Sequence, residues 1–199
     1  MSTKISKILD ALFVSKVRIK ALEFFCLNPE KEIHLRGIVK ELDEEVNSVR
    51  RVLGKLSECG FLKETVKGNR KYFELNGNNP LVNEVISMFH KANGLGKEII
   101  ESKNKLGNIE YAFLTPNYTK GIFMGLQIID LVVIGDVNLT ELANLINNYQ
   151  TKINREIHYM VLKSSEFLLK KRRRDQFIID LLMQDNVLLI GNRDQFVRC

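Results

Sequence analysis

The stretch that decides the fold of the first half of the chain runs VNSVRRVLGKLSECG, from Val46 to Gly60. Its apolar residues recur at steps of three and four, which predicts a helix. At 100° per residue they fall within one arc of about 80°, so we expect this face to pack inward. These residues are Val46, Val49, Leu53 and Leu56. Gly60 is the residue type expected just past a helix end.

The opposite face of this predicted helix is polar. Arg51 lies roughly opposite the centre of the apolar arc, and Arg50 lies nearer the flank. Three further polar residues flank Arg51, namely Asn47, Ser48 and Lys55. Arginine can form bidentate hydrogen bonds with guanine, and asparagine can form them with adenine, whereas serine and lysine commonly contact phosphates. This pattern indicates a helix that reads a groove of duplex DNA.

The surrounding segments fit the same purpose. Apolar periodicity predicts helices over about 5–13, 15–27 and 35–42. Strand-like runs follow at 61–66 and 71–75, and the segment between them, Lys67-Gly68-Asn69-Arg70, is typical of a hairpin turn. Helix, helix, turn, helix and hairpin is the order of a winged helix-turn-helix. We expect the hairpin tip, with Lys67, Asn69 and Arg70, to reach the minor groove or phosphates.

Two further basic residues, Arg36 and Lys40, precede the reading helix, and we expect them to contact phosphate. Three acidic residues, Asp43-Glu44-Glu45, favour the N-terminus of that helix but repel phosphate. The alternative interpretation is that each polar group belongs to an ordinary solvated face.

Residues 15–75 resemble winged-helix regulators of the ArsR type. The resemblance rests on SKVRIKALEFF, LRGIVKEL, NSVRRVLGKL and GNRKYFELN. It implies a transcriptional regulator that binds double-stranded DNA. ArsR-type metal sensors carry a Cys-x-Cys box in the helix that corresponds to LRGIVKEL, and this segment has no cysteine. We therefore predict no metal site and no cofactor.

The second half alternates predicted strands with predicted helices, which is typical of an α/β or mixed-sheet domain. The strands are expected at 110–114, 128–134, 156–161 and 187–190, and the helices at 97–106, 139–149, 165–172 and 175–183. The predicted fold class is α+β in two domains. Residues 1–80 form the winged helix, 81–96 form a connecting or dimerisation helix, and 97–199 form the small α/β domain.

Residues 110–191 resemble the minimal nucleotidyltransferase fold related to DNA polymerase β. The resemblance rests on YAFLTPNYTKG, IIDLVVIGDVNLTELANLI, NREIHYMVLKSSEF and NVLLIGNRDQF. It implies a Gly-Ser after the first strand, to admit a phosphate, and an Asp-x-Asp pair on the second strand. In active members of the family those carboxylates bridge two magnesium ions.

This chain departs from that pattern where chemistry would occur. Pro116-Asn117 replaces Gly-Ser, and Ile128 replaces the first aspartate, which leaves Asp130 alone. Lys120 and Gly121 survive. Because one carboxylate cannot hold the usual two-metal site, we predict that the domain is catalytically inactive and that Asp130 is a leftover strand-end residue.

Composition agrees with a basic protein of ordinary globular type. The 199 residues carry a net charge of +6 with a pI near 9.2, which tolerates a polyanionic partner. The unpaired spacing of three cysteines and the lack of a run of about 18 apolar residues predict a cytoplasmic protein without a membrane span. We expect a homodimer through the apolar helix predicted over 81–92, through the first helix, or through both.

The leading hypothesis is therefore a dimeric DNA-binding regulator that is not an enzyme. A small-molecule or nucleotide effector, and a contribution of the basic run 170–174 to phosphate or partner binding, stay open. One alternative is an active, antitoxin-like nucleotidyltransferase with a winged-helix accessory domain. Another is a winged helix that binds protein.

Overall fold

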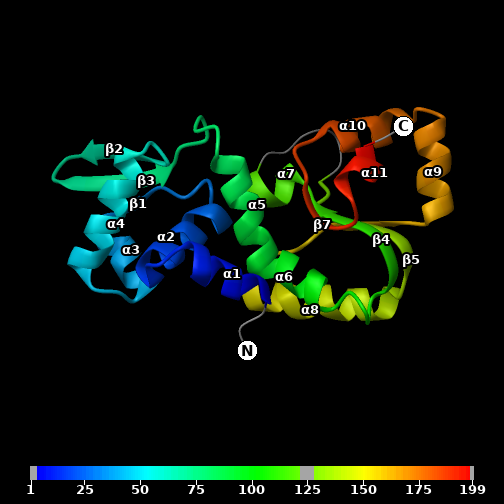
Figure 1. The fold of residues 1–199 in the computed structure, drawn as a ribbon, viewed down its shortest axis with the longest axis horizontal. Helices are drawn as coiled ribbons and strands as arrows, with labels where there is room; N and C mark the ends of the chain where they lie inside the picture. Colours follow the sequence, from blue (N-terminus) through cyan, green and yellow to red (C-terminus); the bar gives the residue numbers. More distant parts are fainter. Residues whose placement is uncertain (1–3, 122–127, 198–199) are drawn as a thin grey trace. The chain divides into compact units, whose positions relative to one another are not determined.

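A computed structural model of the protein describes residues 4–121 and 128–197 (Figure 1). The chain mixes helices with two β-sheets and divides into two compact units, Met1–Asn93 and Gly94–Cys199. The helix expected to connect two domains belongs to the first unit, because its apolar side chains lie in the core of that unit. Within the described residues no helix is both long enough and apolar enough to cross a bilayer.

The first unit contains the helices and strands in the predicted order. They are α1 (Lys4–Leu12), α2 (Lys16–Leu27), β1 (Ile33–His34), α3 (Leu35–Leu42), α4 (Val46–Glu58), β2 (Leu62–Lys67), β3 (Arg70–Leu75) and α5 (Val82–Ala92). The three strands form an antiparallel sheet in the order β1-β3-β2.

Local signals set the limits of these elements. The Ser15 side chain accepts a hydrogen bond from the Arg18 amide at 3.4 Å and caps α2, as the predicted start of that helix requires. Gly60 has φ of 72°, a conformation that glycine adopts without strain, so α4 ends where expected. Lys67 pairs with Arg70 across a two-residue turn, which confirms the predicted hairpin.

The core of the first unit is formed by the inner faces of its helices and by the sheet, and it includes Phe25, Ile38, Leu53, Phe73 and Phe89. One predicted core residue is wrong. Val46 is 38% exposed, and Val52 is buried in its place. The buried arc of α4 is thus rotated by about 30° from the predicted one, since Val52 extends it on one side and Val46 drops out on the other.

The second unit has one central sheet. Its elements are α6 (Gly94–Glu101), β4 (Gly107–Leu114), α7 (Pro116–Lys120), β5 (Leu131–Val137), α8 (Leu139–Ile153), β6 (Tyr159–Leu162), α9 (Ser164–Arg172), α10 (Gln176–Met183), β7 (Val187–Ile190) and α11 (Arg193–Val197). The strand order is β6-β5-β4-β7; β5 and β6 are parallel, and the other two pairs are antiparallel.

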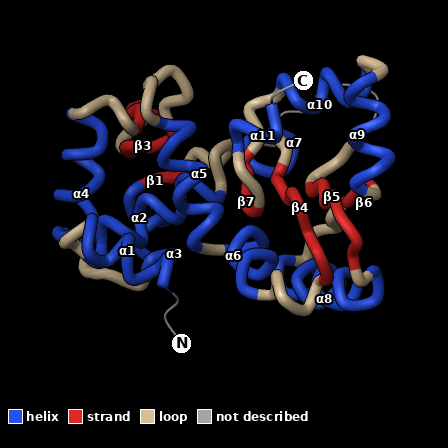
Figure 2. The backbone as a smooth tube through the Cα atoms, turned by 45° about the vertical axis from the view of Figure 1, so that its right-hand side comes forward, coloured by secondary structure: helices blue, strands red, loops and turns tan. Residues whose placement is uncertain are grey.

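Helices cover both faces of this sheet, so the unit has three layers (Figures 1 and 2). On one face Leu131 and Val133 pack with residues of α6 and α8. On the other face Val132 and Ile134 pack with residues of α9 and α10. Successive side chains of a strand point to opposite faces, which is why a strand covered on both sides reads as an uninterrupted apolar run.

Several predicted limits in the second unit are wrong by a few residues. The second strand begins at Leu131 rather than Ile128, and the third begins at Tyr159 rather than Glu156. The segment 116–120, which lies between two predicted strands and outside the predicted helices, forms the short helix α7. Apolar content alone misplaced the strand starts, because a strand begins where its hydrogen-bonded pairing begins. Leu131 is the first residue of β5 that pairs with β4 and with β6.

Candidate functional site

The first candidate site is the outward face of α4. On a helical wheel the buried residues centre nearly opposite Asn47 and Arg51, so these two side chains lie at the middle of the exposed face. Arg50 and Lys55 are also exposed and lie on opposite flanks, whereas Ser48 is half-buried. Because Val52 is buried instead of Val46, the exposed face of α4 is rotated. Asn47 therefore lies nearer the centre of that face than predicted, and Ser48 lies at its edge.

The N-terminus of α4 is capped by a carboxylate. Both Glu45 oxygens accept hydrogen bonds, from the Asn47 and Ser48 amides, at 2.8 Å each. These backbone hydrogen bonds, with a smaller electrostatic contribution from Arg51, lower the pKa of Glu45 below its ordinary value. Glu44 binds Lys20 at 2.6 Å. Both acidic groups are thus engaged in holding the helix start.

The β2–β3 hairpin carries the second set of predicted contacts. Lys67 binds Glu32, which also accepts a hydrogen bond from Thr65 at 3.1 Å. The hydrogen bond with Glu32 raises the pKa of Lys67 and lowers that of Glu32. Lys67 therefore anchors the hairpin, and the exposed residues Asn69 and Arg70 remain as its tip.

The hairpin and the reading helix lie on one side of the unit (Figure 1), and α4 contacts β2 directly. Arg36 and Lys40 are exposed on α3, which also contacts α4. The His34 Nδ1 atom caps α3 by accepting a hydrogen bond from the Gly37 amide at 3.1 Å. The structure therefore brings α3, α4 and the hairpin together, with every predicted DNA-contacting side chain except Ser48 exposed.

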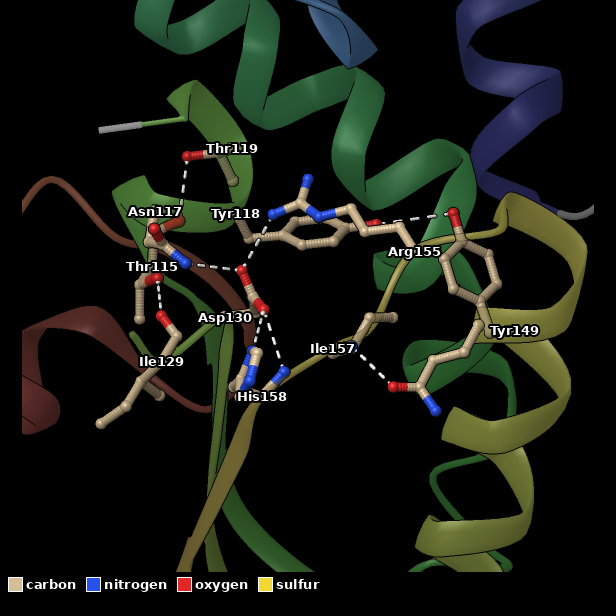
Figure 3. Close-up of polar contacts among 11 residues, drawn as sticks. Thr115, Asn117, Tyr118, Thr119, Ile129, Asp130, Tyr149, Arg155, Ile157 and His158 are labelled. Carbon is tan, nitrogen blue, oxygen red and sulfur yellow. Dashed lines mark hydrogen bonds and ion pairs between the residues drawn. The ribbon is translucent and has the colours of Figure 1, made fainter. Parts of the chain in front are cut away.

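The second candidate site is a polar cluster in the second unit, centred on Asp130 (Figure 3). Asp130 is 1% exposed and lies just before β5. Its backbone carbonyl accepts from the Thr115 amide at 3.0 Å, and its amide donates to the His158 carbonyl at 2.7 Å. The residue thus connects the segments that follow β4 and precede β6.

The Asp130 carboxylate is fully engaged. Oδ1 accepts from the Asn117 amide nitrogen at 2.7 Å and from the Arg155 guanidinium at 3.1 Å. Oδ2 accepts from the His158 backbone amide at 2.9 Å, and the His158 Nδ1 atom lies 3.6 Å away. A buried carboxylate is tolerated when it is paired and hydrogen-bonded in this way.

Aromatic residues border the cluster. The Arg155 guanidinium lies over the Tyr118 ring at 5.2 Å, and the hydroxyls of Tyr118 and Tyr149 are 3.5 Å apart. Burial raises the pKa of Tyr118, so this phenol stays protonated. Gln150 accepts from the Ile157 amide at 2.6 Å and fixes the turn that leads to His158.

Most of the other residues that the nucleotidyltransferase resemblance singled out lie in α7 or at its end. Pro116 begins α7 and is buried with Asn117, whose amide oxygen has no hydrogen-bond partner among the described residues. Lys120 binds Asp185 at 2.6 Å, and Gly121 ends α7 with φ of 63°. Ile128 is 50% exposed.

These residues do not fit a two-magnesium site. Asp130 contributes one carboxylate, and both of its oxygens already accept hydrogen bonds. Glu156, the other nearby acid, has a side chain that is 79% exposed. Across residues 4–121 and 128–197 no three acidic, histidine or cysteine side chains gather as a metal ion requires. The absence of a metal from the protein nevertheless stays a prediction.

Sequence reasoning missed Arg155 and the His158 backbone as partners of Asp130. It also described Asp130 as a leftover strand-end residue, whereas the structure makes it the centre of a buried network. The available signal was its charge in the apolar run 128–134, since a charge in such a run needs a partner.

Comparison with known proteins adds little to this geometry. No family model and no curated protein matches the chain. Among solved structures it is similar to reduced HlyU from Vibrio cholerae N16961, at 14% identity and a TM-score of 0.34. That likeness covers 44% of this chain and 86% of HlyU. At this TM-score the likeness does not establish a shared fold.

Proposed function

We propose that the first unit is a winged helix-turn-helix that binds double-stranded DNA and that the protein is a transcriptional regulator. The observation that carries this proposal is the exposed face of α4, with Asn47 and Arg51 at its centre. An α-helix fits the major groove, where arginine and asparagine make bidentate contacts with guanine and adenine. Arg36 and the hairpin tip then flank the duplex on either side of α4.

The charge distribution supports the same orientation. Arg50, Arg51 and Arg70 have no carboxylate within 4 Å among the described residues, so their charges are available to phosphates. By contrast, Lys63, Lys67 and Lys71 each bind a glutamate of the unit. We therefore assign base or phosphate contacts to the arginines and a supporting role to the hairpin lysines.

The test is binding of the purified protein to a labelled duplex, measured by fluorescence anisotropy over a range of salt concentrations. Genomic fragments retained by the protein supply the duplex. Arg51→Ala should weaken binding by about 1–3 kcal/mol and relax the preference at one base pair. Arg193→Ala, an exposed arginine of the second unit, is the matched control and should leave affinity unchanged.

Two outcomes would reject the DNA proposal. One is an affinity that does not fall with salt, because phosphate contacts release counterions. The other is an equal loss in the Arg51 and Arg193 variants. If α4 contacts a protein partner instead of DNA, Arg51→Ala should weaken duplex binding no more than Arg193→Ala, which is the second outcome.

For the second unit we propose a nucleotidyltransferase-like domain that does not transfer nucleotides. The engaged carboxylate of Asp130 and the buried Pro116 support this, since neither an open pair of carboxylates nor a glycine at the phosphate position is available. Incubation with labelled nucleotides and Mg²⁺ tests it. Metal-dependent transfer that Asp130→Ala abolishes would favour the active enzyme instead.

We also propose a homodimer. The apolar residues of α5 lie largely in the core of their own unit, so the exposed apolar surface nearby comes mostly from α1 and the chain around it. Its residues are Ile8, Leu12 and Val14, and Leu81, which directly precedes α5, is exposed as well; the four side chains are 54–95% exposed. Light scattering at micromolar concentration should give twice the 23.0 kDa mass of the chain, and Leu12→Glu should reduce it.

A further inference from the structure

A groove of about 330 Å³ opens on the first unit between α2 and the last turns of α4. This volume lies at the lower end of the range for small-molecule sites, roughly 300–1,000 Å³. Phe13 and Val85 complete its walls. All of its described lining residues belong to the first unit, and none of them belongs to the Asp130 cluster.

The interior of the groove is apolar. Leu22, Leu56 and Phe61 are 4–8% exposed and form its floor, whereas Phe13 and Val85 are half-buried. A ligand with an apolar body would gain the usual free energy of removing hydrocarbon from water here. A strongly polar ligand such as a sugar would find few partners on this floor.

Among the described residues that line the groove, the two charged ones are both basic. Arg18 comes from α2 and Lys55 from α4, so the two charges face the groove from different helices. Within the described residues, no carboxylate lies within 4 Å of either one. Two cations beside an apolar floor are complementary to an anion that carries a hydrocarbon chain.

We propose that this groove binds an amphipathic anion, namely a small carboxylate with an aliphatic body. Its carboxylate lies between Arg18 and Lys55, and its chain lies over Leu22, Leu56 and Phe61. Lys55 belongs also to the helix assigned to DNA, so an occupied groove neutralises one charge of that interface. That consequence rests on the proposed DNA binding, but the binding of the anion does not.

The probe is decanoate below its micelle concentration, titrated into the full-length protein by calorimetry. Decanoate should bind with one site per chain. The dissociation constant of octanoate should be higher by about fourfold for each methylene that it lacks, and decyltrimethylammonium should not bind. Decanol should bind more weakly than decanoate, and added salt should reduce only the binding of decanoate. Equal binding of decanoate and decyltrimethylammonium would overturn the proposal.

Charge variants test the two cations. Arg18→Gln and Lys55→Gln should each weaken decanoate binding about two- to fivefold, the range expected for partly exposed ion pairs. Lys16→Gln is the matched control, because Lys16 is an exposed cation on α2 that does not line the groove. If all three variants weakened decanoate binding equally, the binding would reflect only the net positive charge of the protein, and the proposed site would be refuted.

The thiol of Cys59, exposed at the edge of the groove, gives a readout of position. In a Cys199→Ser background, saturating decanoate should slow the alkylation of Cys59 by iodoacetamide at least threefold, followed by mass spectrometry. Decyltrimethylammonium at the same concentration should not. Decanoate that binds but leaves the alkylation rate unchanged would place the ligand elsewhere and overturn the assignment. DNA takes no part in these measurements, so they stand apart from a failure of the DNA proposal.

Discussion

Removal of the Asp130 carboxylate should destabilise the second unit, because donors from two other segments, α7 and the turn before β6, converge on that group. Asp130→Ala leaves the Asn117 amide, which is buried, and the His158 backbone amide without their acceptor. Arg155 also loses its partner, but its side chain is 47% exposed and water can replace the carboxylate.

The magnitude follows from this difference in exposure. A buried donor left without an acceptor costs about 1–3 kcal/mol, which applies to the Asn117 amide, and the part-buried His158 amide costs up to as much. The half-exposed Arg155 adds at most about 1 kcal/mol. We expect a loss of about 2–5 kcal/mol in the free energy of unfolding. Asp130→Asn should lose less, because the amide keeps the shape and one oxygen for Asn117.

Urea titration followed by tyrosine fluorescence measures this loss in the right part of the chain. The protein has no tryptophan, and four of its five tyrosines, Tyr111, Tyr118, Tyr149 and Tyr159, lie in the second unit. Asp136→Asn removes an exposed carboxylate from β5, the strand that follows Asp130; it is the control and should stay within about 0.5 kcal/mol of the wild type.

The opposite result would refute the structural role of Asp130. Carboxylates kept for chemistry often cost stability, so their replacement by an amide leaves a protein equally or more stable. If Asp130→Asn were as stable as the wild type, and if Mg²⁺ stabilised only the wild type, Asp130 would be a metal ligand. The proposal of an inactive domain would then fail with it.

Three further predictions concern local features. Because the pKa of Glu45 is lowered, its cap on α4 stabilises the fold at pH values above the ordinary carboxyl pKa of 4.5, and this stabilisation is lost as the pH falls below that value. The urea midpoint of Glu45→Gln should therefore lie below that of the wild type near neutral pH, and the difference should shrink toward low pH. Gly135→Ala should lower the free energy of unfolding by about 1–3 kcal/mol or more, because φ is 147° and a Cβ would lie 2.3 Å from the Asn108 carbonyl oxygen. Gly54→Ala is its counterpart: the space around Gly54 is open, so the substitution should stabilise α4 by about 0.5–1 kcal/mol. Cys26 is buried and its pKa is raised, so mass spectrometry should find Cys59 alkylated in the native protein and Cys26 only after unfolding.

The sequence by itself determined the features that depend on neighbours along the chain. Ser15 begins α2, Gly60 ends α4, and Gly68-Asn69 turns the hairpin, because capping and turn conformations are properties of a few consecutive residues. Helical periodicity likewise placed Arg51 on the outer face of α4. These energies are local, so a reading of the chain recovers them.

Only the tertiary structure decided which rim residue of α4 is buried and what Asp130 does. Val46 and Val52 are equally apolar, and the choice between them depends on where other segments cover the helix. Asp130 acquires its role from Asn117, Arg155 and His158, which lie 13, 25 and 28 residues away along the chain. The groove between Arg18 and Lys55 likewise exists only where α2 meets α4. Such contacts depend on how distant segments pack, and no local pattern encodes that packing.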